Sequence, residues 1–169
     1  MSVTAASRSG AHQPVLPLPL RPPAAPAAVA LLKEAQRGLT EAEYATDPAP
    51  RFIASYLAAL RAGAAVLAAR GRPHRGRARP ASVWVLLEAA APELGEWAAF
   101  FAANSATQAA AQAGITRRIT ARSADDLLRQ AAQFLVLADR IVQGRRVSDG
   151  LPLPRQCGTP AGRGRTPSG

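Results

Sequence analysis

The chain has 169 residues, enough for one domain, and its 13 Gly and 15 Pro gather toward the two ends. The single cysteine, Cys157, excludes an internal disulfide and a cysteine-based zinc site, and the two histidines, His12 and His74, are too far apart for a His-rich metal site. We therefore expect no metal and no cofactor. The N-terminal prolines exclude a signal-peptide core, and the longest uncharged run is too polar to span a membrane. These features predict a cytoplasmic protein.

The formal charge of +10 is concentrated in a few segments. One ten-residue stretch carries five arginines, and the last 26 residues carry most of the remaining excess. Several guanidinium groups close together in a glycine-containing segment can follow a sugar-phosphate chain. The alternative is a solvated linker rich in Arg through codon usage, since 40 Ala and 20 Arg against one Lys indicate a high-G+C genome. The candidate polyanion-binding residues are Arg70, Arg72, Arg75, Arg77 and Arg79.

Composition divides the chain into three parts. Residues 1–25 form a Pro/Ala-rich arm and residues 145–169 form a basic Pro/Gly-rich tail, and we expect both to be disordered because neither shows hydrophobic periodicity. Residues 26–144 are rich in helix formers and are predicted to form the folded domain.

The first two helical segments follow each other closely. Residues 27–37 read as a helix that Gly38 interrupts, and Thr40 with Glu43 forms a predicted capping box for residues 41–45. The two pieces can also form one kinked helix. The next helix starts with Asp47 as the N-cap residue and runs to about residue 70. Its apolar stripe consists of Phe52, Tyr56, Leu60, Gly63 and Leu67.

Three more helical segments are predicted downstream. One runs from about residue 81 to residue 90 with Ser82 as its cap, and Pro92 then begins a helix that ends at Gly114. The last helix is predicted to start at Ser123 and to end at Gly144. Within it, Asp125 is expected to pair with Arg129 four residues on, and the apolar stripe is Leu127, Ala131, Phe134, Ala138 and Ile141.

No stretch shows the alternation of a strand, so the sequence predicts an all-α fold, an antiparallel bundle of four to five helices. Two carboxylate pairs, Glu93 with Glu96 and Asp125 with Asp126, lie in predicted first turns, where acids suit the helix dipole without any catalytic role. The aromatic residues near Trp97 fall at helical spacing, which is typical of a core.

The motifs occur in an unusual order: Asp47-Pro48, Ser82 to Leu87 with Trp84, Pro92-Glu93-Leu94 followed by Glu96-Trp97, and Ala124 to Leu128. In this order the chain resembles an actinobacterial family of small HEPN-domain proteins over residues 27–143. The resemblance implies a HEPN helical bundle, a fold found in ribonuclease toxins, in partners of nucleotidyltransferases and in proteins without an assigned role. We also expect a homodimer formed through a helix face.

Active HEPN ribonucleases carry an Arg and a His separated by four to six residues. Here the nearest pairs, Arg8 with His12 and Arg70 with His74, are separated by three residues, so no catalytic residue is assigned. We expect a non-catalytic binding module for nucleic acid or for a protein partner such as a nucleotidyltransferase or an antitoxin. The alternatives are a divergent metal-independent ribonuclease that uses Arg70, Arg72 and His74, and a purely structural interaction protein.

Overall fold

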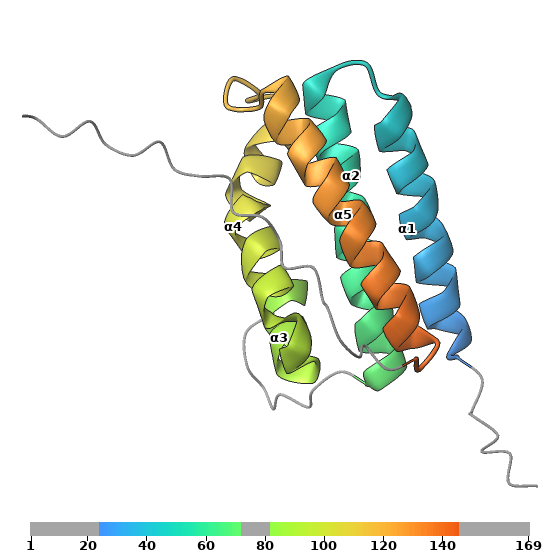
Figure 1. Cartoon of the computed structure of the whole chain (residues 1–169). Helices are drawn as coiled ribbons and strands as arrows, with labels where there is room; N and C mark the ends of the chain where they lie inside the picture. Colours follow the sequence, from blue (N-terminus) through green and yellow to red (C-terminus); the bar gives the residue numbers. More distant parts are fainter. Residues whose placement is uncertain (1–23, 72–81, 146–169) are drawn as a thin grey trace, which may run out of the picture.

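The computed structural model of the chain describes residues 24–71 and 82–145. Over these residues it contains helices and no strand, which confirms the predicted all-α bundle (Figure 1). The elements are α1 (Pro26–Tyr44), α2 (Pro48–Arg70), α3 (Val83–Ala90), a 3₁₀ turn η1 (Pro92–Leu94), α4 (Gly95–Gln112) and α5 (Ala121–Val142). Most of the predicted arm and tail, including His12, Cys157 and the tail arginines beyond residue 145, lies outside the described residues.

Helix α2 is the centre of the bundle and packs against α1, α3, α4 and α5. It is the one described helix that is long and apolar enough to cross a membrane, but more than half of its apolar window is buried by these neighbours. Its hydropathy is therefore accounted for by its position in the core. Successive long helices run in opposite directions, whereas α2 and α5 run the same way (Figure 1).

Helix α1 is continuous through Gly38, so the predicted interruption is wrong and the single-helix alternative is correct. A Cβ atom built on Gly38 would lie 3.5 Å from Cβ of Ala58 on α2, which shows how closely the two helices approach. Packing along α2 stabilises the helix against the cost of an internal glycine. The predicted capping box is also absent, because the Thr40 hydroxyl donates to the carbonyl of Gln36 within the helix.

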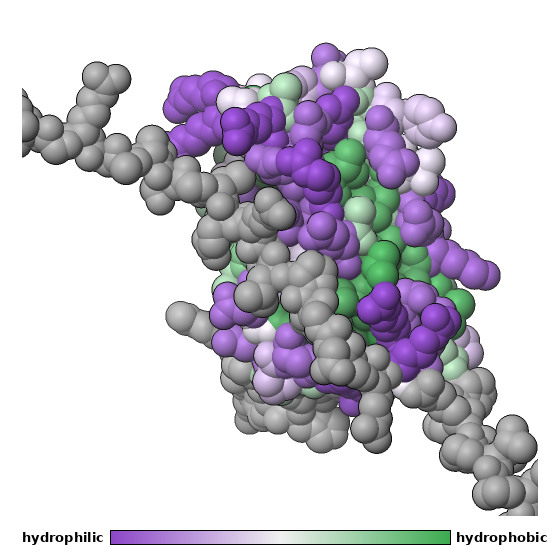
Figure 2. Space-filling view, viewed as in Figure 1, coloured by the Kyte–Doolittle hydropathy of each residue, from purple (hydrophilic) through white to green (hydrophobic). Residues whose placement is uncertain are grey.

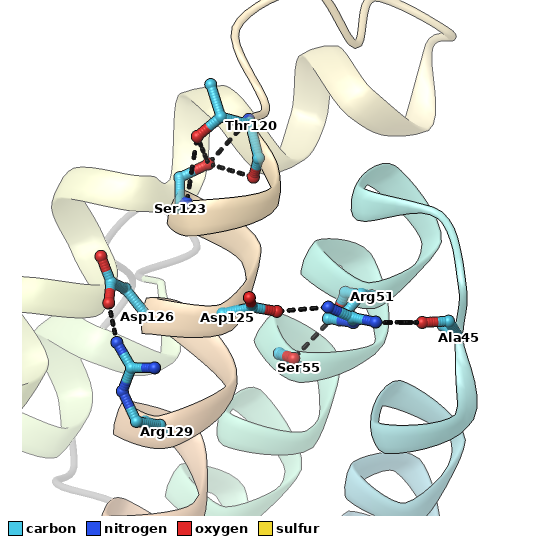
Figure 3. Close-up of polar contacts among 8 residues, drawn as sticks. All are labelled: Ala45, Arg51, Ser55, Thr120, Ser123, Asp125, Asp126 and Arg129. Atoms are coloured by element: carbon cyan, nitrogen blue, oxygen red, sulfur yellow. Dashed lines mark hydrogen bonds and ion pairs between the residues drawn. The ribbon is translucent and has the colours of Figure 1, made fainter.

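The start of α5 differs from the prediction by one turn. Thr120 is the N-cap residue: its side chain accepts from the backbone N–H of Ser123, and the Ser123 hydroxyl accepts from the backbone N–H of Thr120 (Figure 3). Ser123 is thus the third residue of a capping box and not its first. Helix α4 also begins later than predicted, at Gly95, because the residues from Pro92 form a 3₁₀ turn before it.

The helix ends at Gly114 and Gly144 are confirmed. Both glycines have a positive φ, 83° and 62°, and each lies in a Schellman motif that closes the last turn. In α5 the motif consists of the bonds from Gly144 N to Ile141 O (2.8 Å) and from Arg145 N to Arg140 O (2.7 Å).

The core is built around an aromatic cluster that joins α3, α4 and α5. Trp84, Trp97, Phe101 and Phe134 are all buried, and the Phe134 ring lies 5.2 Å from that of Phe101 and 5.7 Å from that of Trp97. The Trp84 indole donates to the hydroxyl of Tyr56 (2.7 Å), which is 2.7 Å from the hydroxyl of Ser105. This polar chain fixes α2, α3 and α4 relative to one another. Trp97 and Phe101 are therefore confirmed as core residues, whereas Phe100 is only partly buried against the core.

Candidate functional site

The arginine-rich segment begins on the bundle at Arg70, the last residue of α2. The Arg70 guanidinium forms an ion pair with Glu93 of η1 and donates to the carbonyl of Ala90 at the end of α3 (3.3 Å). Gly71, with φ 84°, then ends α2. Arg72, His74, Arg75, Arg77 and Arg79 lie outside the described residues, so the structure does not bring the five candidate arginines together.

Glu93 is held ionised by its partner. The hydrogen bond from Arg70 is the main cause that lowers the pKa of the Glu93 carboxyl below its ordinary value, and burial opposes it. The charged Glu93 carboxylate offsets the positive charge of Arg70 and orients the Arg70 guanidinium toward η1. Arg70 therefore anchors the start of the basic segment to the bundle.

The described residues themselves are close to electrically neutral. They contain 11 basic and 10 acidic side chains, whereas the whole chain has 21 and 11. Nearly all of the formal charge of +10 thus belongs to segments that flank or interrupt the described bundle. A ligand attracted by net charge would be drawn to those segments.

The bundle carries a second basic feature that the sequence pattern did not single out. Arg117 and Arg118 are exposed in the connection between α4 and α5, beside a hollow of about 230 Å³ that Thr107 and Ile115 also line. Arg122, with 93 % of its side chain exposed, follows in the first turn of α5. The adjacent arginines in the sequence were the available signal. This end of the bundle lies opposite the end where Arg70 is located (Figure 1).

Three of the four carboxylates considered as acid–base candidates are paired with arginines. Asp125 pairs with Arg51 of α2 and not with Arg129, which corrects the predicted pair; Arg129 pairs instead with Asp126 (Figure 3). Glu93 pairs with Arg70. The predicted pair was wrong because Asp125 faces α2, and a helix-spacing rule does not consider a partner on another element.

Within residues 24–71 and 82–145, no group of three or more His, Cys, Asp or Glu side chains could hold a metal ion. Both histidines lie outside these ranges. Of the three residues of the alternative ribonuclease reading, the structure describes only Arg70, whose guanidinium is already bonded to Glu93 and Ala90.

No curated protein and no solved structure matches the chain significantly. The SAV_6107-like HEPN family matches residues 42–139, which include α2, α3, α4 and most of α5. The match spans more than half of the chain and contains the aromatic cluster together with the Arg51–Asp125 and Arg70–Glu93 pairs. The chain therefore belongs to the SAV_6107-like HEPN family.

Proposed function

We propose that this HEPN protein is a non-catalytic binding module that takes nucleic acid or another polyanion on the arginine-rich segment of residues 70–79. The observation that carries the proposal is the distribution of charge: the described bundle is nearly neutral, while this segment has five arginines in ten residues. Phosphate binding through such a segment depends on counterion release.

The contacts of Arg70 support this proposal. The ion pair with Glu93 joins the start of the segment to η1, and α3 begins at Val83, four positions after Arg79, so both ends of the segment lie close in sequence to packed elements. A basic segment attached at both ends loses less conformational freedom on binding than a free tail does. Arg70 acts as an anchor, and the other four arginines provide the phosphate contacts.

A protein partner, such as a nucleotidyltransferase, an antitoxin or a second copy of this chain, remains a prediction from the sequence, as does the cytoplasmic location. The ribonuclease alternative requires Arg70, Arg72 and His74 to form one site. The pairing of Arg70 with Glu93 weighs against that alternative, because a cation that stabilises a phosphate transition state must be free to contact it.

The test compares two triple variants with the same change in charge. Arg72→Gln, Arg75→Gln and Arg77→Gln remove three cations from the proposed segment; Arg117→Gln, Arg118→Gln and Arg122→Gln remove three from the opposite end of the bundle. Fluorescence anisotropy of a labelled single-stranded RNA, measured from low to physiological salt, gives the slope of log K against log salt. The first variant should reduce the slope by about 2, because each phosphate contact on a single strand contributes about 0.7.

The second variant should leave the slope nearly unchanged. An equal reduction by both variants would show that only net charge matters, and a reduction by the second variant alone would move the site to the α4–α5 connection. Either result would contradict the proposal.

A further inference from the structure

An apolar groove runs between α1 and α5. It encloses about 430 Å³, its floor and sides are formed by Val29, Leu32, Leu135, Val136 and Val142, and its rim is polar. Figure 2 shows this strip of apolar surface between the two helices, bordered by polar residues. Val29 and Val136 are 37 % and 53 % exposed, which makes them two of the five large apolar side chains exposed on the described surface.

The groove exists because α1 and α5 each pack on α2 more closely than on one another. Small residues such as Gly38 bring α1 close to α2, whereas the larger Leu32 of α1 and Leu135 of α5 line the groove between their helices. The exposed apolar surface is larger than a single scattered side chain, and its polar rim is typical of a docking surface.

A short apolar segment occurs close to the groove in the sequence. Val142 and Gln143 line the groove, and eight residues after Gln143 the chain reads Leu151-Pro152-Leu153-Pro154. Seven residues lie between Gln143 and Leu151, and the eight Cα–Cα steps that join the two span at most about 28 Å, while the groove extends about 12 Å along α5 from Leu135 to Gln143. The Leu-Pro segment can therefore reach every part of the groove.

The sequence between α5 and this segment suits a reversal of direction. Gly144 has φ 62° and already turns the chain away from the axis of α5, and Asp149-Gly150, a frequent turn pair, directly precedes Leu151. Prolines at alternate positions restrict the free chain, so that ordering it on a surface costs less entropy. Arg155, the next residue, would meet the carboxylate of Asp139 on the rim.

A second Leu-Pro segment, Leu16-Pro17-Leu18-Pro19, precedes α1, but it is less suited to the groove. Between it and α1 lie Pro22 and Pro23, and Pro26 begins the helix. Proline fixes its own φ and restricts the residue before it, and no glycine occurs between Leu18 and Pro26 to allow a tight reversal. The N-terminal copy thus provides a control of nearly the same composition.

We infer that the segment Leu151–Pro154 of the same chain docks in the groove between α1 and α5, with Leu151 and Leu153 on Val29, Leu32 and Val136. The docked segment covers the exposed apolar side chains and runs along α5 in the opposite direction. Because it then leads toward Gln36, Cys157 would lie near that end of the groove.

Cysteine cross-linking tests this inference on the full chain. Gln36→Cys places a thiol on the rim of the groove, and oxidised glutathione allows it to form a disulfide with Cys157, which peptide mass spectrometry identifies. From Gln143, Cys157 can reach about 48 Å, so mere proximity would also permit reaction with an exposed thiol elsewhere. Ala102→Cys, an exposed position on α4, measures that background. The disulfide with residue 36 should form at least about tenfold faster than that with residue 102.

The second comparison uses the two Leu-Pro segments. Leu151→Asp with Leu153→Asp should slow the cross-link to residue 36 to the background rate, whereas Leu16→Asp with Leu18→Asp should leave it unchanged. Equal rates at residues 36 and 102 would overturn the inference. A cross-link that depends on Leu16 and Leu18 would also overturn it, because the groove would then belong to the N-terminal arm. A disulfide between two chains would overturn it as well and would assign the groove to a second copy. Helical circular dichroism of each variant verifies that the bundle is intact.

Discussion

Arg51 of α2 and Asp125 of α5 form an ion pair that joins two helices running in the same direction (Figure 3). Arg51 also donates to the carbonyl of Ala45 through Nε (3.1 Å) and Nη2 (2.6 Å), so one guanidinium binds the end of α1 and the start of α5. The Arg51 side chain is 22 % exposed, which limits competition from water. This residue therefore fixes the relative positions of three helices.

Replacing this arginine should lower the stability of the bundle. Arg51→Ala is expected to lower the free energy of unfolding by about 2 kcal/mol, because it leaves the Ala45 carbonyl and Asp125 without their partner. Arg129→Ala removes the more exposed pair with Asp126 and should cost less than about 0.5 kcal/mol. Urea denaturation of both variants measures the difference; equal losses would mean that the Arg51 contacts add nothing beyond a surface ion pair.

The aromatic cluster should carry much of the stability. Trp97→Ala and Phe134→Ala, both at fully buried positions, should each cost about 3 to 5 kcal/mol through lost burial and the cavity left behind. Phe100 is only partly buried against the same core, so Phe100→Ala should cost clearly less. If thermal or chemical unfolding gave losses below about 1 kcal/mol for Trp97→Ala and Phe134→Ala, the described packing of α4 and α5 would be wrong.

Two helical glycines should respond in opposite ways to the same substitution. At Gly38 the atom nearest to an added Cβ is at the guanidinium end of Arg61, at 3.1 Å, and this flexible side chain can move aside. Gly38→Ala should therefore raise the free energy of unfolding by about 0.5 to 1 kcal/mol, because alanine has the higher helix propensity. At Gly63 the added Cβ meets Val83 at 3.2 Å and the Trp84 ring at 3.4 Å. Gly63→Ala should therefore destabilise by about 1 kcal/mol. Melting temperatures that shift in the same direction for both variants would contradict this packing.

The Arg70–Glu93 pair should make a small, pH-dependent contribution to stability. Because the folded-state pKa of Glu93 is lowered from 4.5, its contribution is fully present above that value and is lost as the pH falls through the folded-state pKa. Glu93 is 37 % exposed, so the contribution should stay below about 1 kcal/mol. The stability advantage of wild type over Glu93→Gln should therefore be largest above pH 4.5 and should shrink as the pH falls below that value. A difference that does not shrink with falling pH would have another cause.

Helical periodicity was sufficient to predict the fold. The stripe from Leu127 to Ile141 is buried at every predicted position, because a 3.6-residue repeat places those side chains on one face whatever that face contacts. The partner of Asp125 could not be predicted, since Arg51 is 74 residues away in sequence and the two meet only when α2 and α5 pack. Gly38 likewise reads as a breaker until its contact with α2 is known.

The candidate site could be predicted only as a set of charges. The sequence identifies the arginine-rich segment, but the ion pair between Arg70 and Glu93 forms only because η1 lies next to the end of α2 in the folded bundle. The exposed Arg117 and Arg118 were visible as adjacent residues, yet nothing local distinguishes them from other surface arginines until the end of the bundle is assembled.

A protein that binds nucleic acid without cutting it must bind RNA reversibly and leave the RNA intact, and both properties can be measured on one sample. Labelled single-stranded RNA is incubated with purified full-length protein at low salt in the presence of EDTA, its binding is recorded by anisotropy, and the same RNA is then separated on a denaturing gel. We predict that the RNA is bound, is released by added salt, and is recovered intact from both wild type and His74→Ala. RNA that wild type cleaves and His74→Ala leaves intact would show that the protein is a ribonuclease. RNA that is not bound at all would rule out the polyanion site.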